Sequence, residues 1–129
     1  MTIGLIGYGL AGSVFHAPLI ETTPGLRLAA IVTGNQERVD LARRKHPHAH
    51  VFATPEQLWD EGGIDCVVIA TPNTSHTPLA RAAISHGVAV VVDKPLAISS
   101  EQAFSVIAEA ERQGVLLTVF QNRRWDGDF

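Results

Sequence analysis

The sequence lacks several features that would point to particular classes of protein. Cys66 is the only cysteine among 129 residues, so no intrachain disulfide can form, and its apolar surroundings favour a buried small side chain. No apolar run approaches the roughly 18 residues that a membrane span requires. The ten Lys and Arg residues are scattered and the formal net charge is −3, which argues against a nucleic-acid partner. We therefore expect no membrane and no nucleic acid, and a cytoplasmic location.

Two catalytic signatures are also missing, a nucleophile elbow and a lysine of the Walker type after the glycines of residues 7–12. His46, His48 and His50 alternate around Pro47, a pattern that invites a metal site. However, no cysteine or pair of carboxylates is adjacent, and a loop between a helix and a short strand is a poor place for a rigid site. We expect no metal.

What the sequence does contain is an alternation of apolar strands and helices. Hydrophobic residues make up 46% and charged residues 18%, a mixture typical of a globular domain. The apolar runs predict strands at residues 2–6, 26–32, 51–52, 64–70, 88–92 and 115–120. Helical segments are predicted at about residues 10–21, 35–45, 55–61, 74–86 and 100–112.

This alternation predicts an α/β fold with a doubly wound, mainly parallel sheet of six strands in the order 3-2-1-4-5-6, a Rossmann fold. In that order the first and fourth strands are neighbours, and a ligand binds outside their carboxyl ends. The prediction brings residues 7–12, 71–73 and 93–95 to one edge of the sheet. No domain boundary is visible before residue 120.

A glycine-rich turn follows the first strand and opens the first helix. Gly7 permits a tight turn, Gly9 lets the backbone approach a pyrophosphate, and Gly12 lets the helix pack close to its strand. The helix N-terminus offers free N–H groups and partial positive charge to a phosphate. The predicted dinucleotide turn consists of Gly7, Tyr8, Gly9, Leu10, Ala11 and Gly12.

The residues after the second strand bear on the choice between NAD and NADP. An acid about 20 residues past the glycines would bind the 2′-hydroxyl of NAD, but Val32, Thr33 and Gly34 occupy that stretch. The missing carboxylate removes repulsion against a 2′-phosphate, and Arg38 in the next helix could pair with it. Alternatively, Arg38 is only a solvent-facing helix residue. We expect NAD or NADP, with a preference for NADP.

The loop after the fourth strand carries Thr71, Pro72, Asn73 and His76. Asn73 and His76 are three residues apart, so they share a face of the first helical turn. There they could hydrogen-bond a nicotinamide, its ribose or a substrate hydroxyl. The alternatives are helix capping for Asn73 and a partly exposed position for His76.

Asp93, Lys94 and Pro95 follow the fifth strand. A lysine in a partly dry site can polarise a carbonyl or take part in proton transfer, whereas most lysines are only solvated charges. A cis Pro95 would fix how Lys94 projects. His16 lies beside Pro18 on the first helix, where packing or capping is a more common role than catalysis.

Taken together, four groups of motifs resemble the Gfo/Idh/MocA oxidoreductases, which include glucose–fructose oxidoreductase and inositol dehydrogenase. They occupy residues 7–12 with 15–18, residues 70–73 with 76, residues 93–95, and residues 121–126. The resemblance implies an NAD(P)-dependent enzyme acting on a sugar, polyol or similar hydroxy compound. An alternative is a non-catalytic dinucleotide-sensing module on the same fold, although a lysine at the nicotinamide end favours an enzyme.

The resemblance also implies roles for individual residues. Lys94 corresponds to the active-site lysine of the family, while Asp93 replaces the usual glutamate and leaves the contacts of that carboxylate open. The pyrophosphate is assigned to Gly7, Gly9 and Gly12, with Tyr8, Leu10 and Ala11 in the same turn. The remaining predicted cofactor contacts are Thr33, Gly34, Arg38, Ala70, Thr71, Pro72, Asn73, His76, Asp93 and Lys94.

A second domain is the last implication of the resemblance. Residues 1–120 are expected to form the dinucleotide-binding domain. Residues 121–129 are expected to begin a substrate domain absent from this chain, which supplies the substrate pocket, a proton-transfer histidine and the homo-oligomer interface. The chain alone should then bind a dinucleotide without efficient turnover, because hydride transfer needs both reactants in a near-attack geometry. Without that domain, Trp125 and Phe129 are expected to be exposed or disordered.

Overall fold

A computed structural model of the protein describes residues 1–127. Its strands are β1 (Thr2–Ile6), β2 (Arg27–Val32), β3 (His50–Phe52), β4 (Cys66–Ile69), β5 (Ala89–Asp93) and β6 (Leu117–Phe120). Its α-helices are α1 (Ala17–Thr22), α2 (Gln36–Lys45), α3 (Pro55–Glu61), α4 (His76–Ser85) and α5 (Ser100–Gln113). Three shorter helical turns are η1 (Ala11–His16), η2 (Asn73–Ser75) and η3 (Asn122–Trp125).

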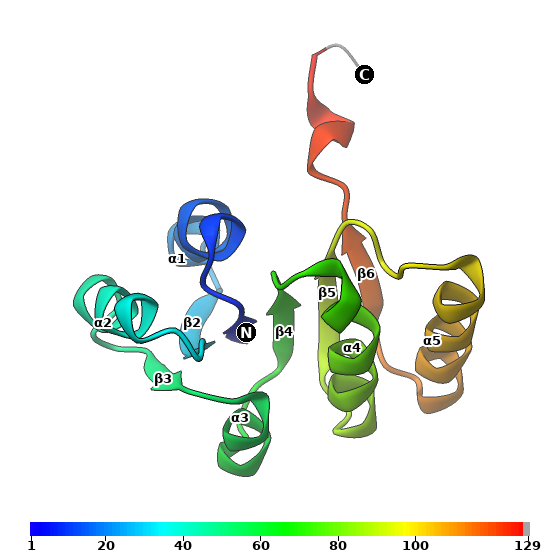
Figure 1. Ribbon diagram of the computed structural model, residues 1–129, viewed down its shortest axis with the longest axis horizontal. Helices are drawn as coiled ribbons and strands as arrows, with labels where there is room; N and C mark the ends of the chain where they lie inside the picture. Colours follow the sequence, from blue (N-terminus) through cyan, green and yellow to red (C-terminus); the bar gives the residue numbers. More distant parts are fainter. Residues whose placement is uncertain (128–129) are drawn as a thin grey trace.

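The six strands form one sheet in the order β3-β2-β1-β4-β5-β6, which confirms the predicted order (Figure 1). All neighbouring strands run parallel. Ile6 at the end of β1 is in register with Val32 on one side and with Ile69 on the other. Asp93 at the end of β5 is in register with Phe120. The loops that leave these strands therefore begin at one edge of the sheet, as the fold prediction required.

Helices cover the sheet with two separate apolar clusters. The first cluster packs Leu58 of α3, Ile84 of α4 and Val106 of α5 against the sheet. The second packs Ile20 of α1 and Ala42 of α2 against it. A fully buried Leu, Ile or Val side chain stabilises the fold by about 1.5–3 kcal/mol. These two clusters fix the helices on the sheet whose carboxyl edge carries the predicted site residues.

The first helix was predicted over about residues 10–21, with Pro18 kinking it or ending it early, and the structure divides it into η1 and α1 just before Pro18. Residues 11–16 form a π-helical turn, in which the N–H of Ala17 donates to the carbonyl of Gly12, five residues back. Pro18 gives the physical reason, because it has no N–H to donate to Val14 in an α-helical register. Pro18 instead occupies the first turn of α1, where a missing donor is tolerated.

The last strand and the tail also differ from prediction. β6 begins two residues later than expected, because the N–H of Val115 donates to the carbonyl of Ala110 and closes α5. Residues 122–125 form a 3₁₀ turn where no element was predicted. Trp125 is 86% exposed, as expected, whereas Phe129 lies outside the described residues. Within residues 1–127, no helix has the length and apolarity needed to cross a membrane.

Candidate functional site

The turn after β1 is shaped by two glycines that touch other backbone. Gly7 has a φ of +100°, which favours glycine, and its N–H donates to the carbonyl of Val32 at 2.9 Å. A Cβ at Gly7 would collide with the carbonyl of Ala70, and one at Gly12 would collide with the carbonyl of Gly7. Both glycines are therefore required by the packing of the turn against β4 and η1.

Gly9 differs from the other two glycines because a Cβ there would meet no backbone. The nearest atoms to such a Cβ belong to the guanidinium of Arg38, with Nη1 at 3.7 Å. Arg38 comes from the first turn of α2, where its N–H donates to the side chain of Asn35. The bare backbone of Gly9 thus lies beside a positive charge, an arrangement suited to an anionic group.

Tyr8 was predicted as a cofactor residue, and the structure places its side chain in the core. The side chain is 1% exposed, and its hydroxyl lies 2.8 Å from Nε2 of His46. Nδ1 of His46 lies 2.7 Å from a carboxylate oxygen of Glu21. Burial raises the pKa of the Tyr8 phenol, and the nearby charge of Glu21 raises it further. Only the backbone of Tyr8 is left for a ligand.

A cleft of about 510 Å³ extends from the glycine turn across the ends of β1, β2 and β4. It brings together predicted site residues from three distant segments of the chain: Gly7, Tyr8, Gly9, Thr33, Gly34, Arg38, Ala70, Thr71 and Pro72. Leu10 and Gly12 do not line it; Leu10 is 74% exposed and Gly12 is buried below the turn. We call this cavity the long cleft.

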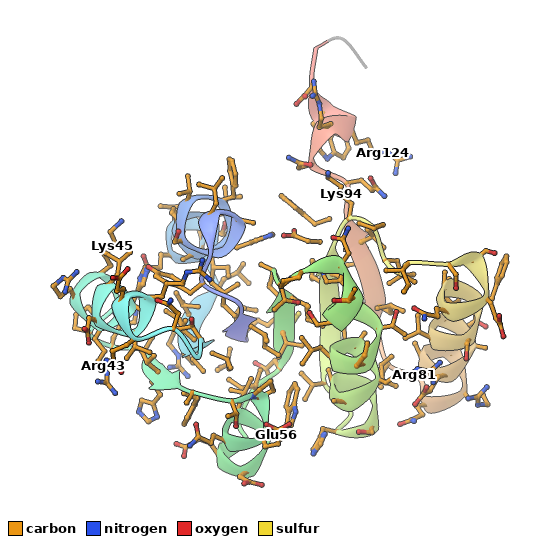
Figure 2. All side chains as sticks on the ribbon, in the orientation of Figure 1. Arg43, Lys45, Glu56, Arg81, Lys94 and Arg124 are labelled. Atoms are coloured by element: carbon orange, nitrogen blue, oxygen red, sulfur yellow. The ribbon has the colours of Figure 1, made fainter. Side chains whose placement is uncertain are left out.

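A second cavity of about 270 Å³ lies further along the same edge and shares Thr71 with the long cleft. Its lining includes the other predicted site residues Ala11, Asn73, His76, Asp93 and Lys94, together with Phe15, His16, Phe120 and Asn122. Figure 2 shows Lys94 at the carboxyl end of β5 and β6. We call this cavity the lysine pocket.

The electrostatics around the long cleft agree with the absence of an acid after β2. Within residues 1–127, no carboxylate forms an ion pair with Arg38. Glu37, the nearest acid in the chain, is not among the residues that line the cleft. Thr33, the residue directly after β2, is buried and lines the cleft. Of the described residues that line the long cleft, Arg38 is therefore the charged one, and none is a carboxylate.

His76 is neither partly exposed nor available as a hydrogen-bonding group for a cofactor. It is 1% exposed, its Nδ1 lies 2.7 Å from the carbonyl oxygen of Pro95, and its Nε2 lies 2.8 Å from that of Thr71. Both ring nitrogens are thus engaged by backbone, and the ring ties the loop after β4 to the loop after β5. The peptide between Lys94 and Pro95 is cis.

His16 was expected to serve packing or capping, and the structure also places it in the lining of the lysine pocket. Its Nε2 lies 2.7 Å from Oδ1 of Asp93, and its ring packs on Phe120 with centroids 4.8 Å apart. Although 77 positions separate His16 from Asp93, His16 lies in the turn after β1 and Asp93 ends β5, two strands whose carboxyl ends the predicted sheet order had placed at one edge. That shared edge was the available signal, but the π-helical turn that aims His16 had not been foreseen.

The alternating histidines of the 46–50 loop engage carboxylates. His46 and His48 both approach Glu21, and His50 lies 3.4 Å from Glu61. A search of residues 1–127 for three or more clustered His, Cys, Asp or Glu side chains able to hold a metal ion finds none. The three histidines therefore contact carboxylates of α1 and α3.

Comparison with known proteins identifies a family. Residues 1–121 match the family model GFO_IDH_MocA, described as an oxidoreductase family with an NAD-binding Rossmann fold. The uncharacterized oxidoreductase YdgJ of Escherichia coli is 46% identical over 98% of this chain, and the scyllo-inositol 2-dehydrogenase (NADP(+)) IolW of Bacillus subtilis is 37% identical over 98%. An oxidoreductase from Agrobacterium radiobacter, solved with NAD+, L-tartaric acid and magnesium, superposes with a TM-score of 0.91 at 29% identity.

The chain is short beside these relatives. It spans 36% of the length of YdgJ and 35% of that of IolW. It covers 36% of the Agrobacterium chain, whereas 97% of this chain is matched. The similarity therefore concerns about one third of each relative.

Proposed function

Since the chain belongs to the Gfo/Idh/MocA family and represents its NAD-binding Rossmann domain, we propose that the long cleft and the lysine pocket together hold one NADP or NAD molecule. The observation that carries this proposal is the bare backbone of Gly9 beside the Arg38 guanidinium. In this proposal the turn at residues 7–9 binds the pyrophosphate through backbone N–H groups, and Arg38 adds charge. Thr71 belongs to both cavities, which supports a single elongated ligand.

The proposed cofactor preference is NADP. Thr33 and Arg38 line the long cleft where the ribose of the adenosine half belongs, and no acid lines it there. A guanidinium forms bidentate, charge-assisted hydrogen bonds with a phosphate, so a 2′-phosphate gains more from Arg38 than a 2′-hydroxyl does. The NADP(+) in the name of the relative IolW is consistent with this preference.

The proposed chemistry takes place in the lysine pocket. When bound, the nicotinamide ring supplies hydride acceptance or donation. Lys94 polarises the reacting oxygen of the substrate or exchanges a proton with it, and Asn73 and Asn122 line the same pocket as hydrogen-bonding groups. A sugar or polyol suits these polar side chains, and the relative IolW is named as a scyllo-inositol dehydrogenase.

We further propose that residues 121–129 lead into a substrate-binding domain. Asn122 lines the lysine pocket, and η3 projects away from the carboxyl edge of the sheet (Figure 1). A chain that continues from η3 is therefore well placed to cover the pocket, and the greater length of the relatives supports this. The proposal also includes homo-oligomers formed through that domain and a cytoplasmic location.

Calorimetric titration of this chain with NADPH and with NADH tests the proposal. We expect saturable binding of both nucleotides, with NADPH the tighter. Tighter binding of NADH would contradict the cofactor preference while leaving the dinucleotide site intact. The proposed site would be overturned if neither NADPH nor NADH bound to this chain, and neither bound to a longer chain that includes the proposed second domain.

A further inference from the structure

His16 and Asp93 connect two parts of the site that are distant in the sequence. His16 ends the π-helical turn that follows the glycine turn, and Asp93 ends β5 directly before Lys94. Nε2 of His16 lies 2.7 Å from Oδ1 of Asp93, and both side chains are largely removed from solvent, at 6% and 19% exposure. Hydrogen bonds to a carboxylate in such surroundings are stronger than those between neutral groups at the surface.

The chemistry of this pair fixes the direction of the hydrogen bond. A carboxylate accepts hydrogen bonds, so Nε2–H of His16 donates to Asp93. Among residues 1–127, every buried side-chain nitrogen or oxygen has a hydrogen-bonding partner. For the His16 ring, the nitrogen that bonds to Asp93 is Nε2. The ring is also held from the side by Phe120, which is in register with Asp93 on the neighbouring strand.

The hydrogen-bond partner of the Asp93 carboxylate affects Lys94, the next residue in the chain. Within the described chain, Lys94 forms no ion pair with Asp93 or with any other acid. His16 thus engages one oxygen, Oδ1, of the carboxylate that directly precedes Lys94 in the chain. All three residues line the lysine pocket.

We propose that His16 is a positioning residue for Lys94, acting through its hydrogen bond to Asp93. The bond fixes the last residue of β5, keeps its carboxylate turned to η1, and so sets where Lys94 enters the lysine pocket. The inference rests on the proposed function only in giving Lys94 a catalytic role. It also accounts for the aspartate before Lys94, whose carboxylate finds its partner in His16.

Lysine-labelled NMR spectra of this chain test the proposal directly. The sequence has two lysines, Lys45 and Lys94, so a sample labelled at lysine Cε gives two side-chain signals. Figure 2 shows Lys45 on α2 and Lys94 at the end of β5, on separate halves of the molecule. The signal of Lys45 thus serves as an internal reference for effects that are not local to the pocket.

Two substitutions at His16 separate the hydrogen bond from packing. His16→Phe keeps an aromatic ring against Phe120 but removes the donor, whereas His16→Gln keeps an N–H that can donate to Asp93. We expect His16→Phe to shift the Lys94 signal and His16→Gln to leave it close to the wild-type position. His50→Phe is the matched control, because His50 also pairs with a carboxylate, that of Glu61, but at the start of β3 on the opposite edge of the sheet.

An unshifted Lys94 signal in His16→Phe, or an equal shift in His16→Gln, would overturn the proposal. If His16→Phe fails to fold, long-range nitrogen–proton spectra of the wild-type ring decide the matter, because a proton on Nδ1 alone rules out donation from Nε2. NADPH titration of the same samples keeps the two proposals apart. If the wild-type chain binds no nucleotide, the proposed function is contradicted. The shift of the Lys94 signal still tests the role of His16 in that case.

Discussion

The three glycines of the turn after β1 are required for different physical reasons. Gly7 and Gly12 are fixed by backbone carbonyls that a Cβ would strike, whereas Gly9 faces only the flexible side chain of Arg38. The tight turn at Gly7 and the close packing at Gly12 agree with the sequence prediction, whereas the pyrophosphate role of Gly9 stays a prediction. Sequence reasoning could not foresee that the guanidinium of Arg38 would lie beside Gly9.

This difference predicts different outcomes for two valine substitutions. We expect Gly9→Val to fold with nearly unchanged stability but to lose nucleotide affinity by tenfold or more, since a branched side chain occupies the proposed pyrophosphate position. Gly12→Val should lower the melting temperature strongly, because its side chain meets the carbonyl of Gly7. Thermal melts monitored by circular dichroism and calorimetric titrations check both. Normal NADPH binding by Gly9→Val would count against the proposed site.

Arg38 provides the second prediction at the scale of a residue. Removal of a charge-assisted hydrogen bond costs about 1.5–3 kcal/mol, so Arg38→Ala should weaken NADPH binding by roughly ten- to a hundredfold. NADH has no 2′-phosphate and should lose less affinity. Arg43→Ala, in the last turn of the same helix, is the control and should change neither affinity. Equal losses for the two nucleotides would place Arg38 at the pyrophosphate alone.

Side-chain direction was the weakest part of the sequence prediction. The positions of Tyr8 and His76 were correctly placed next to the cavities, yet their side chains are buried and bonded within the protein. Backbone position follows from strand order, but the aim of a side chain depends on packing partners such as His46 that are remote in sequence. The contact of His16 with Asp93 was not predicted for the same reason.

At the scale of the element, helix ends were predictable where the capping residues are local. Asn35 and Ser99 accept hydrogen bonds from the N–H groups of Arg38 and Gln102, and both residue types are favoured at the position before a helix. Gly114 closes α5 in the left-handed conformation. The π-helical turn could not be predicted from local propensity, since it depends on how Pro18 is accommodated.

Ser99 offers a test of this capping argument. Ser99→Ala removes the acceptor for the N–H of Gln102 and should lower the free energy of unfolding by about 1 kcal/mol. For a domain of this size that corresponds to a fall in melting temperature of roughly 4 °C. Ser100→Ala, one residue later and inside the helix, is the matched control and should stay close to wild type. Nucleotide binding should be unaffected by either change.

At the scale of the whole molecule, the sheet order was predictable because it follows from alternation, strand apolarity and the position of the glycine turn. The same rule correctly brought residues 7–12, 71–73 and 93–95 to one edge. What the rule could not provide was the division of that edge into the long cleft and the lysine pocket, since their boundaries are made by side chains.

Two buried groups, the Tyr8 phenol and the Cys66 thiol, predict how the free energy of unfolding depends on pH. Burial raises the pKa of the Tyr8 phenol and of the Cys66 thiol above their ordinary values of 10.0 and 9.0, with Glu21 and Asp65 contributing respectively. The folded state therefore holds these protons to higher pH than the unfolded chain does. The free energy of unfolding should then fall as pH rises above about 9.

Urea unfolding at about pH 8 and about pH 10.5 measures this dependence. The loss of stability between the two should be smaller in Tyr8→Phe and in Cys66→Ala than in the wild type, whatever their stability at the lower pH. Identical losses in all three proteins would show that other groups govern the alkaline limb.

The π-helical turn has a consequence for how this site can change over evolution. A π turn contains one residue more than the α-helical turn it replaces. Deletion of a single residue within 11–16 would change the winding of this turn and rotate the preceding side chains relative to α1 by about 100°. The meeting of His16 with Asp93 would then be lost without any substitution at either position. Among related chains, the presence of this pair should therefore follow insertions and deletions in this turn more closely than it follows overall identity.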